Sequence, residues 1–182
     1  MISSLAHDLG KVVATQDDLS CKGHAQAGVA IAKKFLKRIT NNKDLIVTAC
    51  KLTKYHVRPA ELLKQKSGIK AYKRLALKLS PHTNLRQLAI LNLTDLQGRN
   101  PTGHEPLVGK YKERLDEFLG KMREVKIEKK PEEPVLLGRH LLDIVPPGPK
   151  LGKLLKKAYK IQIDEGIRDV EELKRRVLKE EK

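Results

Sequence analysis

Residues 25–39 read AQAGVAIAKKFLKRI, and this stretch has the pattern of an amphipathic helix. Apolar residues recur at spacings of three and four, which is the spacing of one helix face. They are Val29, Ala32, Phe35, Leu36 and Ile39. Lysine and arginine fall largely on the other side, and Asn41 and Asn42 are expected to end the helix.

The same period continues through the following segments of the chain. It predicts helices over residues 43–55, 69–79, 85–96 and 107–125, with a short helical piece that starts at Pro59. Ser80-Pro81 separates two of them, because proline cannot extend a helix from that position. No segment shows a convincing strand pattern, and aromatic residues make up only 3% of the chain. The expected fold is all-α.

Residues 126–134 are polar, charged and carry two prolines, as is typical of a linker between compact units. The sequence therefore predicts a helical domain over residues 1–125 and a small helical domain over residues 135–182. In the second domain, Pro149 is expected to begin a helix that Gly166 ends. Asp169 is expected to cap a last helix over residues 170–178.

The chain is strongly basic, with 38 Lys and Arg against 22 Asp and Glu and a formal net charge of +16. Between Lys51 and Arg86, ten residues are basic and only Glu61 is acidic. Such an excess points to a polyanionic partner, although a solvated surface is the alternative. No apolar run is long enough to span a membrane, and no signal peptide is visible. With Cys21 and Cys50 read as reduced thiols, the expected location is cytoplasmic, without membrane contact.

His7 and Asp8 are adjacent and lie near Gly10, which is expected to end a helix. A divalent metal accepts imidazole nitrogen and carboxylate oxygen together. An ion at this position would lower the pKa of water and support phosphoester hydrolysis. The alternative is that His7 and Asp8 only cap and pin helices, with no ion bound.

Other segments strengthen the metal interpretation. They are Leu5-Ala6-His7-Asp8-Leu9-Gly10-Lys11, Gly23-His24-Ala25-Gln26-Ala27-Gly28, Lys54-Tyr55-His56 and Leu93-Thr94-Asp95. In these segments the chain resembles the HD superfamily of helical metal-dependent phosphohydrolases. The resemblance implies that His7, Asp8 and Asp95 hold a first divalent ion. It implies that His24 and His56 hold a second ion or contact phosphate.

The superfamily also has a first histidine on a helix upstream of the His-Asp pair, and only six residues precede His7. We therefore expect an HD-like domain that lacks its first helix. Three protein ligands are enough to hold a metal when water completes the coordination.

A second resemblance covers the tail. It is carried by Leu137-Gly138-Arg139-His140-Leu141-Leu142-Asp143, by Pro146-Pro147-Gly148-Pro149-Lys150-Leu151-Gly152-Lys153-Leu154-Leu155, and by Ile163-Asp164-Glu165-Gly166 with Glu171-Glu172-Leu173. This pattern is similar to the tRNA-contacting C-terminal segment of bacterial CCA-adding enzymes and poly(A) polymerases. Residues 89–99 resemble the end of the HD domain that precedes that segment in one branch of the family.

The resemblance implies a tRNA-binding C-terminal portion of such a nucleotidyltransferase, with tRNA or another structured RNA as partner. The catalytic head of the family uses an Asp-x-Asp pair with Mg²⁺ and CTP or ATP, and no Asp-x-Asp occurs in this chain. The head is therefore expected to be truncated or encoded separately. The alternative function is a stand-alone HD-type metal-dependent phosphohydrolase.

The expected RNA contacts lie on the basic side of the tail and act through phosphates. They are Arg139, Lys150, Lys153, Lys156 and Lys157. Tyr55, Tyr72 and Tyr159 are possible stacking partners for unpaired bases, with a place in or beside the core as the alternative.

Overall fold

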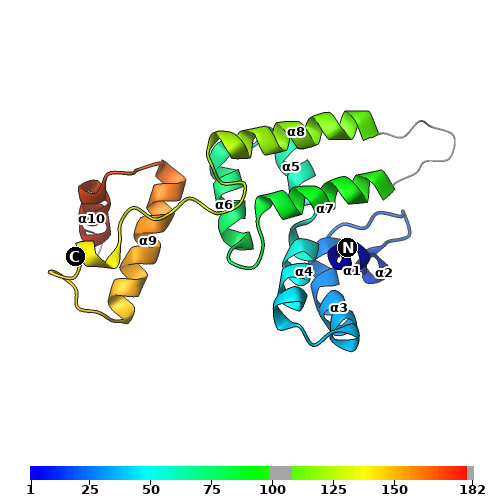
Figure 1. Cartoon of the computed structure of the whole chain (residues 1–182), viewed down its shortest axis with the longest axis horizontal. Helices are drawn as coiled ribbons and strands as arrows, with labels where there is room; N and C mark the ends of the chain where they lie inside the picture. The colour runs from blue at the N-terminus through cyan, green and yellow to red at the C-terminus, as the bar shows by residue number, and fades with distance from the viewer. Residues whose placement is uncertain (99–107, 180–182) are drawn as a thin grey trace. The chain divides into compact units, whose positions relative to one another are not determined.

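The computed structural model describes residues 1–98 and 108–179 of the chain (Figure 1). The described residues form helices and connecting segments without any strand, which confirms the all-α prediction. The chain divides into two compact units, Met1–Pro131 and Glu132–Lys182. We call them unit 1 and unit 2.

Unit 1 is built from α-helices that follow one another along the chain (Figure 1). They are α1 (Ile2–Ala6), α2 (Lys11–Ala14), α3 (His24–Ile39), α4 (Lys43–Tyr55), α5 (Arg58–Lys64), α6 (Ile69–Leu79), α7 (Leu85–Gly98) and α8 (Val108–Glu124). The predicted bounds of α4 and α6 are confirmed. α7 continues to Gly98, two residues beyond the predicted end at residue 96, and residue 107, the predicted start of the next helix, lies outside the described residues.

The core of unit 1 consists mostly of leucine and alanine, as the scarcity of aromatic residues predicts. Leu79, Leu85 and Leu88 are fully buried where α6 and α7 meet. Tyr72 and Phe118 pack beside them with their ring centroids 5.4 Å apart. The expectation that Tyr72 stacks on bases is therefore wrong, because this side chain is 0% exposed.

Residues 126–134 are not a free linker. Ile127 is only 1% exposed and belongs to the core of unit 1. The main-chain carbonyl of Glu128 accepts a hydrogen bond from Arg86 N at 3.1 Å. The charge and the prolines of this stretch predict solvation, but one isoleucine is enough to anchor it to the leucine-rich core.

Unit 2 contains a short 3-10 helix (Gly138–His140), then α9 (Pro149–Glu165) and α10 (Val170–Lys179). As predicted, Pro149 begins α9, Gly166 ends it in the left-handed conformation, and Asp169 accepts a hydrogen bond from Glu172 N. The buried apolar side chains come from the start of the unit and from both helices. They are Leu136, Leu141, Val145, Leu151, Leu154, Ala158, Ile163, Leu173 and Val177.

Buried Gln162 ties the first residues of unit 2 to α9. Its side-chain oxygen accepts from Val135 N at 3.0 Å, and its amide nitrogen donates to Glu132 Oε1 at 3.0 Å and to Glu133 O at 2.8 Å. The hydroxyl of Tyr159 also donates to the carbonyl of Glu132. These bonds satisfy a polar group that is 1% exposed and fix where the unit begins.

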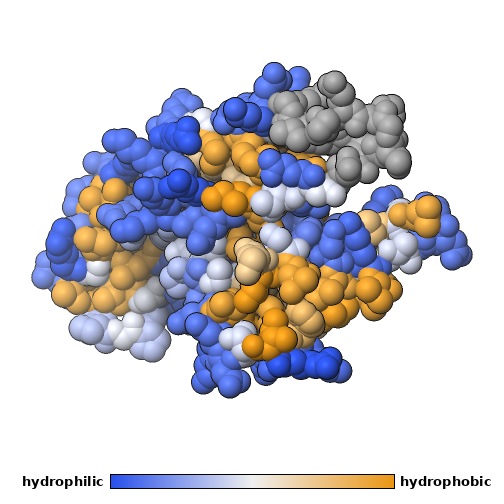
Figure 2. Space-filling model, turned by 45° about the vertical axis from the view of Figure 1, so that its right-hand side comes forward, coloured by the Kyte–Doolittle hydropathy of each residue, from blue (hydrophilic) through white to orange (hydrophobic). Residues whose placement is uncertain are grey.

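The face in Figure 2 carries hydrophilic residues side by side with hydrophobic areas. The exposed large hydrophobic residues include five in the first nineteen positions, namely Met1, Leu5, Val12, Val13 and Leu19. Among the described residues, no helix has both the length and the apolar character that crossing a membrane requires.

Candidate metal centre

The five predicted ligands of unit 1 come from separate elements and converge on one place. His7 is the residue that ends α1, and Asp8 follows it in the turn before α2. His24 is the first residue of α3, His56 ends α4, and Asp95 lies in α7. Each histidine therefore sits at a helix end, where its side chain is free to turn toward the common centre.

Two glycines allow the segment after Asp8 to approach α3 closely. A Cβ atom on Gly10 would lie 2.0 Å from the carbonyl oxygen of His24 and 2.5 Å from Gly28 N. A Cβ atom on Gly28 would in turn lie 3.0 Å from Gly10 N. The backbones are therefore in contact at this point, and this contact brings His24 within reach of Asp8.

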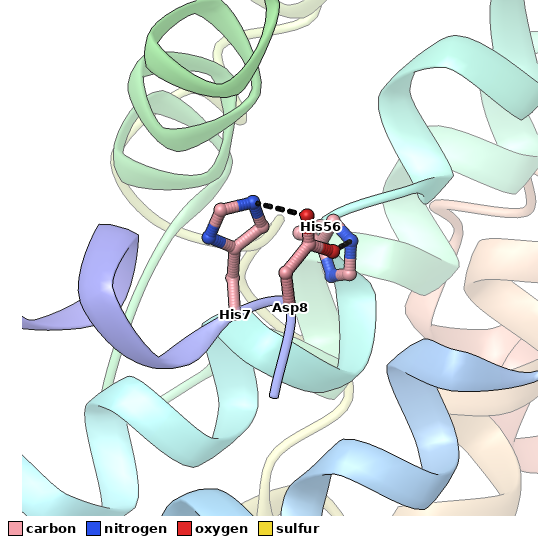
Figure 3. Close-up of side chains that lie close together, drawn as sticks. All are labelled: His7, Asp8 and His56. Carbon is pink, nitrogen blue, oxygen red and sulfur yellow. Dashed lines mark ion pairs between the residues drawn. The ribbon is translucent and has the colours of Figure 1, made fainter. Parts of the chain in front are cut away.

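Asp8 lies at the centre of the cluster, between imidazole rings (Figure 3). Its Oδ2 lies 3.3 Å from His7 Nε2, and its Oδ1 lies 3.3 Å from His24 Nε2 and 3.6 Å from His56 Nε2. One ligand atom from each of His7, Asp8 and His56 lies within 4.8 Å of the others, so these three residues could hold a metal ion. Asp95 joins the cluster through His7, with Oδ1 at 3.3 Å from Nε2.

All three histidines present the same ring nitrogen to the centre. Their Nδ1 atoms contact the carbonyl three residues earlier: His7 to Ser4 O at 2.7 Å, His24 to Cys21 O at 2.8 Å and His56 to Thr53 O at 2.7 Å. A carbonyl oxygen can only accept, so each Nδ1 must be the donor. Each neutral ring therefore keeps a lone pair on Nε2, which is the form that binds metals.

The donor set fits a divalent cation. The Nε2 atoms of His24 and His56 lie 3.0 Å apart, and both lie within 3.6 Å of Asp8 Oδ1. Ligands on one tetrahedral ion at about 2.1 Å lie about 3.4 Å apart, so these separations match one coordination sphere. Nitrogen with carboxylate oxygen is the donor chemistry of zinc, manganese, iron and related ions.

Burial and hydrogen bonding shift the pKa values of two of the histidines in opposite directions. The hydrogen bond with Asp95 raises the pKa of His7, against an opposing effect of burial. Burial lowers the pKa of His56, and the neighbouring His7 and His24 add to that effect. His56 is therefore held in the neutral, metal-binding form to lower pH than an exposed histidine.

Two residues of this centre, Lys11 and Asn92, are not among those predicted from the sequence. Lys11 donates to Asp8 Oδ2 at 2.5 Å, and the i, i+3 spacing of opposite charges at a helix start could have revealed it. Asn92 is buried and donates to the carbonyl of His56 at 3.2 Å, which links α7 to the end of α4. No sequence spacing indicates the contact made by Asn92, because it depends on how the helices pack.

The predicted RNA-binding residues all lie in unit 2. Arg139 is exposed on the 3-10 helix, and Lys150, Lys153 and Lys156 are exposed on α9. Lys157 is half-buried, since it lies nearer to the apolar side of the helix. Tyr159 is partly buried and its hydroxyl is bonded to Glu132, so its role in this structure includes anchoring.

Comparison with protein-family models, with curated proteins and with solved structures finds no match to this chain. The relationships to HD phosphohydrolases and CCA-adding enzymes therefore stay predictions.

Proposed function

We propose that unit 1 is a divalent-metal-dependent phosphohydrolase of the HD type that acts on a phosphomonoester or a cyclic phosphate. The observation that carries this proposal is the convergence of three oriented imidazoles on Asp8, with Asp95 behind His7. Each of the three rings is anchored through Nδ1 on a main-chain carbonyl, so their Nε2 atoms are presented toward one carboxylate. They are well suited to hold a cation.

The residues of the centre would have different roles in holding the ion and the substrate. His24 and His56 offer Nε2 and Asp8 offers Oδ1, so these side chains would hold the ion, and His7 Nε2 lies 3.3 Å from the other oxygen of Asp8. A divalent cation here supplies Lewis acidity toward a phosphoryl oxygen and brings the pKa of water toward neutrality. The carboxylate of Asp95 lies 3.3 Å from His7 Nε2 and accepts a hydrogen bond from that ring when the ring is protonated, and Lys11 offers a positive charge at the partly exposed side of Asp8.

The test is a colorimetric phosphatase assay with Mn²⁺, Co²⁺ or Ni²⁺ on a generic phosphomonoester and on a nucleoside 2′,3′-cyclic phosphate. We expect activity that a chelator removes and that Asp8→Asn lowers by at least about 100-fold. Asp17→Asn is the matched control, because Asp17 is exposed and lies near Asp8 in the chain. Equal activity in both variants, or activity that persists in chelator, would contradict the proposal.

A second function is favoured by the lysine-rich side of α9. We propose that unit 2 binds tRNA or another structured RNA, as the C-terminal portion of a CCA-adding or poly(A)-adding enzyme whose head is provided elsewhere. Support comes from the exposed Arg139, Lys150, Lys153 and Lys156, and from the Gly-Arg segment before α9 and the Pro-Pro-Gly-Pro segment that leads into it. The two half-exposed thiols agree with a cytoplasmic location, which stays a prediction.

Electrophoretic mobility shift with tRNA at two salt concentrations tests this second function. We expect binding that weakens steeply with salt, because phosphate contacts release counterions. A triple variant of Lys150, Lys153 and Lys156 to Gln should lower the affinity at least about 10-fold. The control is the same change at Lys33, Lys34 and Lys37, which are exposed on α3 of unit 1. Equal losses in both triple variants would contradict an interface on α9.

A further inference from the structure

The two carboxylate oxygens of Asp8 face different surroundings. Oδ1 faces His24 Nε2 at 3.3 Å and His56 Nε2 at 3.6 Å, and those two nitrogens lie 3.0 Å apart. Oδ2 faces His7 Nε2 at 3.3 Å and Lys11 Nζ at 2.5 Å. The centre thus has an inner half around Oδ1 and an outer half around Oδ2.

The outer half already contains a permanent cation. The ammonium group of Lys11 lies at charge-assisted hydrogen-bond distance from Oδ2, in the space where an ion bound to that oxygen would lie. It cannot share this position with a metal, because two cations on one carboxylate oxygen repel strongly at such short range. In the inner half, the atoms that face one another are acceptors, namely Asp8 Oδ1 and the Nε2 atoms of His24 and His56. A cation bound there therefore has no positively charged side chain to compete with.

The formal charge of the centre leads to the same conclusion. Asp8 and Asp95 carry two negative charges and Lys11 carries one positive charge, which leaves a single negative charge before any metal binds. One divalent ion already exceeds this charge. A second ion would leave a large positive excess beside the side chain of Asp95, which is 9% exposed.

We propose that the centre takes one divalent cation, bound in the inner half by His24, His56 and Asp8, and that Lys11 keeps a second ion out of the outer half. This inference rests on the proposed metal centre of unit 1. It gives Lys11 a role that sets the metal stoichiometry, with the outer half left for an anionic substrate group.

The experiment counts ions in the full chain. Lys11→Met removes the charge and keeps the length of the side chain, and Lys22→Met is the matched control on an exposed lysine near His24. Equilibrium dialysis against Co²⁺ with elemental analysis gives ions per chain. Electron paramagnetic resonance of Mn²⁺-loaded protein detects spin coupling between two neighbouring ions. Circular dichroism checks that each variant keeps its helicity.

We expect one ion per chain in wild type and Lys22→Met, and two ions with spin coupling in Lys11→Met. His24→Gln should lower the Co²⁺ affinity at least about 10-fold, while His7→Gln should change it less than about 3-fold. Two ions in wild type, one ion in Lys11→Met, or a larger loss in His7→Gln than in His24→Gln would each overturn the inference and leave the proposed function intact. No ion in any of these proteins would overturn both.

Discussion

His24 Nε2 and His56 Nε2 lie 3.0 Å apart, although the two residues are separated by the full length of a helical hairpin. α3 and α4 run side by side and are joined by residues 40–42, so the start of α3 and the end of α4 meet at the same end of the hairpin (Figure 1). Both rings donate through Nδ1 to main-chain carbonyls. When both rings are neutral, their Nε2 lone pairs face each other and repel. A cation bound by both nitrogens removes this repulsion.

Metal binding should therefore stabilise the folded chain. At a Co²⁺ concentration of 100 times Kd, the free energy of unfolding should rise by about 2.7 kcal/mol. For a chain of this size, the thermal midpoint should rise by roughly 5–10 °C. At the same Co²⁺ concentration, His24→Gln should lose about half of this shift or more, and His82→Gln, which changes an exposed histidine, should keep all of it. An equal shift in both variants would mean that Co²⁺ binds somewhere else.

Gly10→Ala should damage the fold and the metal centre together. The added methyl group would meet the His24 carbonyl at 2.0 Å and Gly28 N at 2.5 Å, both of them backbone atoms that cannot move aside. Overpacking of this kind costs about 1–3 kcal/mol, and relief of the clash would draw His24 away from Asp8. Urea denaturation and Co²⁺ titration measure the two effects.

The matched control for that variant is Gly120→Ala. Gly120 lies inside α8, and a Cβ atom there meets nothing within 4 Å. Alanine is favoured over glycine in a helix by about 1 kcal/mol, so this change should stabilise the protein. A similar loss of stability in both variants would refute the importance of the Gly10–Gly28 contact.

The stability of the metal-free protein should depend on pH through His7 and His56, in different ranges. The pKa of His7 is raised above 6.5, so folding favours its protonated form, and its stabilising contribution is lost as the pH rises through the folded-state pKa. The pKa of His56 is lowered below 6.5, so folding favours its neutral form. Its contribution is present above pH 6.5 and is lost as the pH falls through the lowered pKa.

Urea denaturation in chelator at several pH values between 5 and 8.5 separates the two contributions. Relative to wild type, His7→Gln should flatten the decline of unfolding free energy on the alkaline side, and His56→Gln should flatten the decline on the acid side. His82→Gln should leave both slopes unchanged. If His56→Gln does not change how the unfolding free energy declines on the acid side, the burial of His56 is not the cause of that decline.

Gln162→Leu should loosen unit 2 and leave unit 1 unchanged. The substitution removes the acceptor for Val135 N and the donor to Glu132 and Glu133, and a buried group left without its partner costs about 1–3 kcal/mol. Hydrogen exchange should become faster in α9 and stay the same in α4. Lys160→Leu, on the exposed side of the same helix, is the control and should not speed exchange.

The longer helices could be predicted from the sequence because each repeats its apolar spacing several times. α4 and α6 begin and end where the pattern does. The expectation that Gly10 ends a helix was wrong, because α1 ends at Ala6 and Gly10 is the residue before α2. Helices of five and four residues are too short to show a period. Ile127 was assigned to a linker because one apolar residue among charges carries no local signal of burial.

The metal centre could be predicted only in outline. The adjacent His7 and Asp8 are visible as a pair, and the resemblance to the HD superfamily pointed to His24, His56 and Asp95. Which Asp8 oxygen faces which ring depends on the packing of α1, α3 and α4, and no spacing encodes it. The groups that accept hydrogen bonds from the Nδ1 atoms are main-chain carbonyls. Every residue has one, so the sequence cannot indicate these bonds.

The buried position of Ile127 also determines where the two halves of the chain can be cut apart. A fragment that stops at residue 125 loses a side chain from the leucine core, and one that starts at residue 135 loses the Glu132 and Glu133 partners of Gln162. Expression of the halves as separate polypeptides should therefore succeed with a boundary after Pro131, and should give insoluble or unfolded material when residues 126–134 are discarded as spacer.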